Sequence, residues 1–300
     1  MTICTGFIPN NDTVILLQDS IGIVPSSGQQ RSLETKIRDI NDRSFFGIAG
    51  DPYFANEIAR EISGKSFDAT KDLEQYCLNT YSNLHYDKLM KGFLPYFGND
   101  REYFKTLLER DNVPVDLMKE YRARVNDAAD ERPDIMVISY IDGPSIYKIN
   151  VGRQLLENNV GEWLSTGSAA KQFDQNMTNY KYDLDRKGTA KLDVLQGIEA
   201  LLRVAEPTSR TSSTIGPPFD VVYVERKPIP DANLFDGQNF NYRAVRMDKS
   251  KLENVRRAIR AEPDLPTGVI TDWLEMVRDP KIDIKKLRKD IGRKTSVSDD

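Results

Sequence analysis

Short runs of apolar and β-branched residues, separated by polar turns, open the chain. Residues 2–8 and 13–19 are two such runs joined by a Pro-Asn-Asn-Asp turn, a pattern that predicts a β-hairpin. Residues 36–40 and 44–50 form a second pair around an Asn-Asp-Arg turn. The chain is therefore expected to begin with two hairpins, the first starting at its N-terminal residues.

Helical spacing replaces this pattern after residue 50. Asp51 and Pro52 suit the N-cap and the first turn of a helix, and apolar residues recur at helical intervals over 54–62. A second helix is expected over 68–90. Residues 98–132 are charged, which predicts one or two solvated helices inserted into the fold.

Strands return after residue 133. The apolar runs 135–141 and 145–149, separated by Asp-Gly-Pro, predict another hairpin. The elements expected after it are a short strand near 163–164, a helix beginning after 165–168, a helix over 189–204, a polar loop over 208–213 and a strand over 219–224. Strands come in hairpins and helices in pairs, which favours an α+β fold with helices layered outside packed antiparallel sheets.

The composition changes near residue 226, which indicates a domain edge there. Beyond it the chain is first rich in Pro and Asn, then helical in pattern over 249–261 and 268–278, and finally basic. A length of 300 residues fits one large domain with additions. The organisation expected is a domain over 2–225, a helical insertion within it at about 94–133, and a helical extension with a basic tail over 226–300.

Charge and hydropathy narrow the class of partner. The net charge of −4 gives no overall basic footprint for nucleic acid. The longest aliphatic run, residues 14–17, is far shorter than the roughly 18 residues of a membrane span. Residues 281–294 are basic but lack interleaved aromatic side chains, which is typical of a solvated helix face or a docking tail. Neither a membrane nor a nucleic acid is expected as a partner.

The chain contains one histidine, His85, and two cysteines, Cys4 and Cys77. Triads built on any other histidine are excluded, as are zinc sites made of several His and Cys ligands, and we expect no metal and no cofactor. His85 lies in a polar, helical stretch, where a partly exposed surface position is the ordinary interpretation. Two cysteines without disulfide spacing, and an N-terminus without a signal-peptide pattern, favour the cytoplasm.

Thr2 offers a mechanism that needs no histidine. Methionine aminopeptidase removes Met1 when the next residue is small, and Thr2 would then carry both a hydroxyl nucleophile and a free α-amino group. An α-amino pKa of about 7.7–8.0 lies near neutrality, so this amine can act as a general base, and a neighbouring lysine would lower its pKa further. Small residues are common after an initiator methionine, so Thr2 taken alone would be an ordinary strand residue.

Further motifs accompany Thr2. The second strand ends in an acidic residue, Asp19, and Lys36 starts the next strand pair with Gly50 fourteen residues beyond it. Residues 165–168 read Ser-Thr-Gly-Ser. With these motifs the chain resembles the proteasome β-subunit family, the N-terminal-nucleophile hydrolases that include HslV and the bacterial homologue Anbu. The opening residues, Met1–Gly6, are especially similar to the Anbu start.

The resemblance implies a fold and a set of roles. The fold would be a four-layer αββα sandwich, in which two antiparallel sheets are flanked by helices. Thr2 would be the nucleophile, its amine the general base, and Lys36 the charge that tunes this base. Asp19 would position Lys36, the Gly50 backbone N–H would donate to the oxyanion, and Ser168 would orient the nucleophile. Structural alternatives stay open, because the same residues would also serve as a salt bridge, a turn and a helix cap.

The resemblance also implies where the substrate binds and where the chain departs from the family. Ile48 falls where the family sets its first specificity pocket, which implies an apolar side chain on the cleaved residue. The family carries an Asp and a Ser on the loop before its last strand. Residues 208–213 offer hydroxyl groups here, with Ser212 or Ser213 available for the Ser, but they contain no carboxylate.

We therefore expect a threonine-type endopeptidase that cleaves peptide bonds through an acyl-enzyme formed on Thr2. The resemblance implies protein or peptide substrates, a homo-oligomer built as a ring or as stacked rings, and an ATPase or other regulator as a further partner. The missing carboxylate leaves a second hypothesis, a weakly active or inactive structural subunit of such a ring. A third is an acyl transferase or ligase that uses an amine in place of water.

Overall fold

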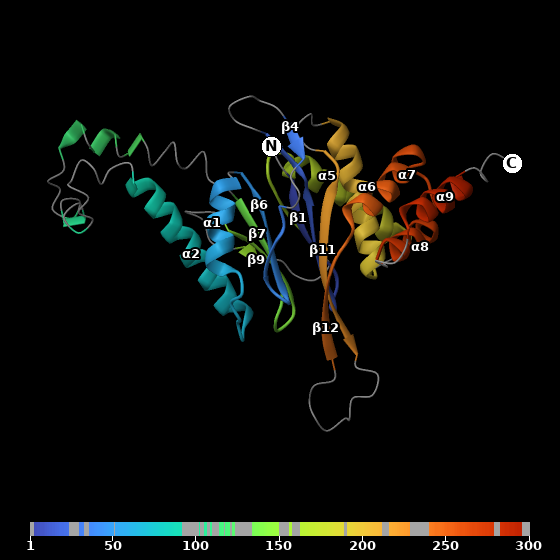
Figure 1. Ribbon diagram of the computed structural model, residues 1–300, viewed down its shortest axis with the longest axis horizontal. Coiled ribbons are helices and arrows are strands. Elements are labelled where there is room, and N and C mark those ends of the chain that lie inside the picture. Colours follow the sequence, from blue (N-terminus) through green and yellow to red (C-terminus); the bar gives the residue numbers. More distant parts are fainter. Residues whose placement is uncertain are drawn as a thin grey trace, which may run out of the picture.

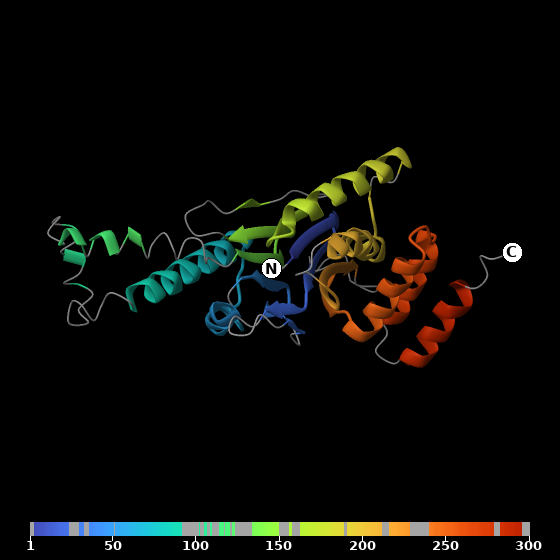
Figure 2. The same cartoon turned by 90° about the horizontal axis from the view of Figure 1, so that it is seen from above.

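Two five-stranded antiparallel sheets lie face to face between layers of helices (Figures 1 and 2). The computed structural model describes residues 3–23, 30–32, 36–50, 52–91, isolated residues and short runs between 102 and 123, 134–149, 156–157, 163–188, 191–211, 216–228, 240–278 and 283–295. The expected α+β sandwich of antiparallel sheets flanked by helices is confirmed. Most of the insertion expected at about 94–133 lies outside the described residues, as do Thr2, Ser212 and Ser213.

The first sheet has the strand order β10-β1-β2-β11-β12. Its strands are β1 (Cys4–Asn10), β2 (Thr13–Asp19), β10 (Trp163–Thr166), β11 (Phe219–Pro228) and β12 (Phe240–Arg246). The predicted hairpin of β1 and β2 is confirmed, and β2 lies at the centre between β1 and β11. The domain edge predicted near residue 226 falls inside β11, and β12 adds a strand from the segment assigned to the extension.

The second sheet has the order β5-β6-β7-β8-β9. Its strands are β5 (Arg38–Asn41), β6 (Ser44–Ala49), β7 (Asp134–Tyr140), β8 (Pro144–Ile149) and β9 (Leu156–Glu157). The two hairpins predicted here, β5–β6 and β7–β8, are confirmed by their antiparallel registers. A separate two-stranded sheet consists of β3 (Ile21–Ile23) and β4 (Gln30–Ser32).

Helices cover the outer face of each sheet. Figure 1 shows α1 (Pro52–Ile62) and α2 (Thr70–Lys91) on the side of the second sheet. The first sheet carries α5 (Ala170–Arg186), α6 (Val194–Thr211), α7 (Lys249–Ala261), α8 (Thr267–Arg278) and α9 (Ile284–Thr295). The predicted loop over 208–213 is wrong for 208–211, which form the end of α6. There the Thr208 hydroxyl donates to the Val204 carbonyl, so the polar residues extend the helix.

Both faces of the first hairpin are buried, which explains its unbroken apolar runs. In β2, Val14 and Leu16 face the second sheet, whereas Ile15 and Leu17 face the helices outside. Alternate side chains of a strand point to opposite faces, so each strand of this kind contributes to two apolar layers. One core cluster therefore lies between the sheets and one lies under each helical layer.

Gly47, in β6, lies where the two sheets approach each other closely beside the end of β2. A Cβ atom at this position would lie 2.5 Å from Cys4 Sγ and 2.5 Å from Gln18 Oε1. Both neighbours are buried, so neither side chain can move away easily. We expect Gly47→Ala to lower the free energy of unfolding by about 1–3 kcal/mol, measured by urea denaturation. Gly143→Ala is the matched control, because a Cβ there meets nothing within 4 Å. Equal losses in the two variants would contradict the close packing of the sheets.

Candidate active site

Asp19 ends β2 and forms a buried ion pair with Lys36. The Asp19 side chain is inaccessible to solvent, and Lys36 Nζ lies 3.3 Å from Asp19 Oδ1. Only 10% of the Lys36 side chain is exposed. The structure thus brings together two of the residues that the sequence predicts for the site, and it places both charges away from bulk water.

Asp19 also holds the N-terminal end of β1. The Ile3 backbone N–H donates to Asp19 Oδ1 at 3.1 Å, and the Asp19 backbone N–H donates to the Ile3 carbonyl at 3.1 Å. These two bonds fix the residue that directly follows Thr2 in the chain. One carboxylate therefore connects Lys36 with the neighbour of the predicted nucleophile, although Thr2 itself lies outside the described residues.

Burial shifts the titration of this pair. It raises the pKa of Asp19 to about 6, against the opposing effects of the Lys36 charge and the Ile3 N–H. Burial also lowers the pKa of Lys36, while the Asp19 carboxylate works in the other direction. The second carboxylate oxygen, Oδ2, is buried and has no hydrogen-bond partner among the described residues. Asp19 therefore keeps one oxygen able to accept a further hydrogen bond.

Because the pKa of Asp19 is raised in the folded protein, the free energy of unfolding should depend on pH. Below about pH 4 the Asp19 carboxyl is protonated in both the folded and the unfolded protein, whereas up to about pH 6 only the folded protein keeps the proton. The stability that this proton contributes is therefore lost as the pH rises through about 6. We expect Asp19 to lower the free energy of unfolding by up to about 3 kcal/mol between pH 4 and pH 7.

Urea unfolding across this pH range tests the prediction. The control is the double variant Asp19→Asn, Lys36→Met, which removes both charges and keeps similar side-chain volumes. The difference in unfolding free energy between wild type and double variant is expected to change with pH in the direction given. A difference that stays constant from pH 4 to pH 7 would contradict the raised pKa of Asp19.

Two glycines and a serine occupy the strand ends expected at the site. Gly50 follows β6 with a φ of +129°, and Gly167 follows β10 with a φ of +100°, values that side chains with a Cβ rarely adopt. Ser168 comes next and is exposed. The N-cap of α5 is Ala169, which makes no side-chain capping bond, so the interpretation of Ser168 as the N-cap of this helix is wrong. The catalytic roles of Gly50 and Ser168 stay predictions.

Ile48 is mostly enclosed by protein. Its side chain is 5% exposed and packs in the cluster between the second sheet and α1 and α2. Its carbonyl accepts a hydrogen bond of 2.6 Å from Gln18 Nε2, which ties the two sheets together beside Asp19. The side chain of Ile48 therefore belongs to the core, and its backbone carbonyl lies near the candidate site. A role of Ile48 in a specificity pocket stays a prediction.

Asp134 is a second carboxylate at this end of the sheets, and the sequence analysis missed it. It begins β7 opposite Ala49, accepts a hydrogen bond from the Thr166 hydroxyl and lies 3.2 Å from Lys148 Nζ. Burial raises the pKa of the Cys4 thiol most, and the negative charges of Asp19 and Asp134 raise it further. An acidic residue at the start of an apolar strand run was the only signal in the sequence.

Lys249, at the start of α7, brings a further cation to the site. Its Nζ lies 3.1 Å from Ser20 Oγ and 3.5 Å from Asp220 Oδ2. Its charge contributes to the lowered pKa of Lys36. The carboxylate of Asp248 caps α7 by accepting from two backbone N–H groups, which fixes where Lys249 leaves the helix. Ser20 and Lys249 are 229 positions apart, so no local pattern could reveal this contact.

No family model and no curated protein sequence matches the chain. Among solved structures, the chain is similar to eukaryotic HslV from Trypanosoma brucei, with 16% sequence identity and a TM-score of 0.42. The match covers 75% of this chain and 99% of that chain. A similarity of this size does not identify a function, which has to be argued from the site itself.

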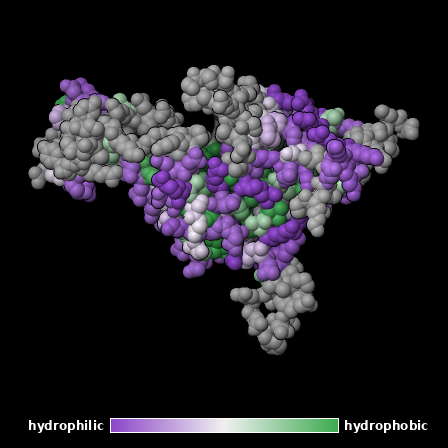
Figure 3. All heavy atoms as spheres, in the orientation of Figure 1, coloured by the Kyte–Doolittle hydropathy of each residue, from purple (hydrophilic) through white to green (hydrophobic). Residues whose placement is uncertain are grey.

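Among the described helices, none is both long enough and apolar enough to cross a bilayer. Hydrophilic residues cover most of the described surface on the face drawn in Figure 3, and hydrophobic residues appear there in small patches. Among the described residues, no three His, Cys, Asp or Glu side chains gather as metal ligands would.

Proposed function

We propose that this protein is a threonine-type endopeptidase whose nucleophile is Thr2 after removal of Met1. The observation that carries the proposal is the buried Asp19 carboxylate, which contacts Lys36 Nζ at 3.3 Å and the Ile3 N–H at 3.1 Å through the same oxygen. A structural salt bridge explains the first contact alone. The second contact links the Lys36 ammonium, through Asp19, to the residue that follows Thr2. A cation held near an N-terminal threonine would lower the pKa of its α-amino group and so activate the nucleophile.

The proposed reaction follows from these groups. The Thr2 α-amino group takes the proton of the Thr2 hydroxyl as its oxygen attacks the scissile carbonyl carbon. The Lys36 charge favours the neutral amine and the developing negative charge, and the Gly50 N–H donates to the oxyanion. Collapse of the tetrahedral intermediate breaks the C–N bond, and the ammonium returns its proton to the leaving amine. Water then hydrolyses the ester and restores Thr2.

Asp134 favours an active enzyme over an inactive structural subunit. The case for inactivity was the missing carboxylate in residues 208–213. Asp134 supplies a carboxylate from a different strand, held by the Thr166 hydroxyl and by Lys148. We propose that it supports the polar environment of the site in place of the missing loop residue.

Covalent labelling tests the proposed nucleophile. An epoxyketone probe reacts with both the hydroxyl and the free amine of an N-terminal threonine, so intact-mass analysis should show a protein without Met1 and with one adduct on Thr2. Quantitative retention of Met1 would exclude the amine as base. Removal of Met1 without labelling would favour the structural subunit, and capture of the acyl group by added amines in preference to water would favour a transferase.

We further propose a homo-oligomeric ring that acts on peptides or proteins in the cytoplasm, with an ATPase or other regulator controlling entry. The opening motif supports an Anbu-like member of the proteasome family, and the two free, buried cysteines support a reducing compartment. Light scattering and negative-stain microscopy of the purified protein test the assembly. A monomer at micromolar concentration would contradict the ring.

A further inference from the structure

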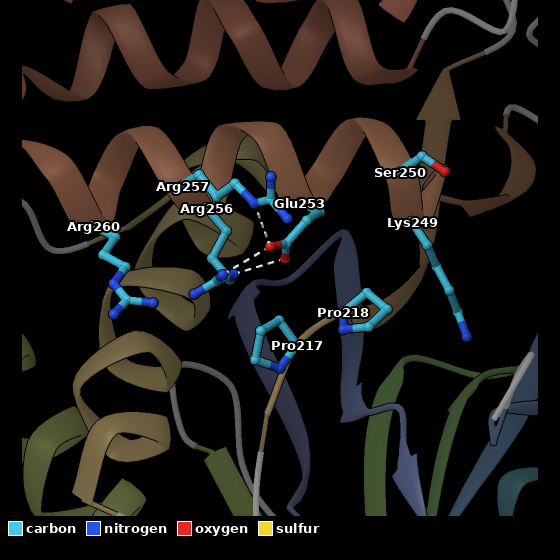
Figure 4. A pocket seen from close by; sticks show the side chains of 8 residues that line it. All are labelled: Pro217, Pro218, Lys249, Ser250, Glu253, Arg256, Arg257 and Arg260. Carbon is cyan, nitrogen blue, oxygen red and sulfur yellow. Dashed lines mark hydrogen bonds and ion pairs between the residues drawn. The ribbon is translucent and has the colours of Figure 1, made fainter. Parts of the chain in front are cut away.

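A groove with basic side chains runs along α7. It has a volume of about 590 Å³, and one wall is Pro217 and Pro218, which precede β11. Figure 4 shows the opposite wall, on which Lys249, Arg257 and Arg260 are spread from the start to the end of α7. The whole chain carries a net charge of −4, so this concentration of cations is a local feature.

The arginines of the groove differ in how strongly they are held. Arg256 is 4% exposed and is paired with both Glu253 and Glu206, so its charge is already compensated within the fold. Arg257 is 66% exposed and donates through Nε to Glu253 at 2.9 Å. Arg260 is 59% exposed, with Nε 3.6 Å from Glu206. Within the described part of the chain, the terminal amino groups of Arg257 and Arg260 have no other partner, which leaves them able to bind an anion.

One end of the groove reaches the candidate active site. Lys249 lines the groove and lies 3.1 Å from Ser20, the residue after Asp19. The Ser20 backbone N–H also donates to the Pro218 carbonyl at 3.1 Å, which joins the other wall to the same point. From Lys249 to Arg260 the helix rises by about 16 Å, the length of about five extended residues. A peptide leaving the site on this side would therefore pass along these cations.

We propose that the groove binds an acidic segment of the polypeptide substrate, and this inference rests on the proposed peptidase function. Guanidinium groups bind carboxylates through two parallel hydrogen bonds, and such pairs give charge selectivity at a surface. The cations follow a line and do not converge on one point, which fits a chain of carboxylates better than a single phosphate. Among the described residues that line the groove there is no aromatic side chain, so these residues offer no stacking platform for a single-stranded nucleic acid.

Peptide binding measured separately from cleavage tests the groove. We would measure fluorescence anisotropy of the full-length protein with three labelled peptides that share a neutral apolar half and end in five Glu, five Gln or five Lys. The Glu peptide is expected to bind at least tenfold more tightly than the Gln peptide at low salt. The double variant Arg257→Gln, Arg260→Gln should remove most of this preference, by about three- to tenfold, because exposed pairs contribute modestly.

The control is Arg60→Gln on α1, an arginine that is 72% exposed and belongs to the helical layer of the other sheet. It should leave the Glu preference unchanged. Equal affinity of the wild type for Glu and Gln peptides, or the same Glu preference in the double variant, would overturn the groove proposal. Tighter binding of an oligonucleotide of equal charge would overturn it too. An arginine-dependent Glu preference without cleavage of any peptide would sustain the groove and contradict only the peptidase function.

Discussion

Thr2→Ala is expected to reduce peptide hydrolysis by at least about 10³-fold, because it removes the nucleophilic oxygen and leaves the rest of the site in place. Alanine is also small, so Met1 should still be removed and the α-amino group should still be free. The assay uses fluorogenic peptides with an apolar residue at the cleaved position, which is the preference expected if Ile48 contributes to the specificity pocket. Thr2 lies outside the described residues, so this variant tests the central assumption of the proposal.

Thr2→Ser is the matched control, since serine keeps both the hydroxyl and the amine. It should retain measurable hydrolysis and epoxyketone labelling, whereas Thr2→Ala should lose both. Hydrolysis by Thr2→Ala at the wild-type rate would exclude Thr2 as the nucleophile. Inactivity of wild type, Thr2→Ser and Thr2→Ala alike would favour a structural subunit.

Local patterns predicted most of the sandwich, and the missed elements show where such patterns fail. The strands β1, β2, β6, β7 and β8 have dense apolar runs because they are buried between layers. β12 has no such run: it is an edge strand whose residues are mostly exposed, and it belongs to the sheet only through its pairing with β11. Polar edge strands of this kind give no hydrophobic alternation to detect.

The candidate site divides in the same way. Asp19 and Lys36 were predicted as partners because they match motifs of the proteasome β-subunit family, and the structure shows them in contact. Asp134 meets Thr166, and Lys249 meets Ser20, only after the sheets and α7 have packed. Charged contacts between distant elements depend on the whole fold, so single-sequence reasoning could not predict them.

Lys36→Met is expected to lower kcat/KM by at least about 10²-fold, because it removes the charge that favours the neutral amine and the oxyanion. The acidic limb of the pH–rate profile should move to higher pH, since the nucleophile's base no longer faces a neighbouring cation. The variant also leaves the Asp19 carboxylate buried without its partner, which should destabilise the fold by about 3–5 kcal/mol. A loss of activity in this variant alone would therefore have two explanations.

The double variant Asp19→Asn, Lys36→Met separates these explanations. It removes both buried charges, and the side-chain amide oxygen that replaces the carboxylate can still accept from the Ile3 N–H, so most of the lost stability should return. Activity should not return, because the lysine charge acts on the reacting groups and not through the fold. Urea unfolding and kcat/KM measured on wild type, single and double variants give both quantities. Recovery of activity together with stability would identify Asp19 and Lys36 as a structural salt bridge only.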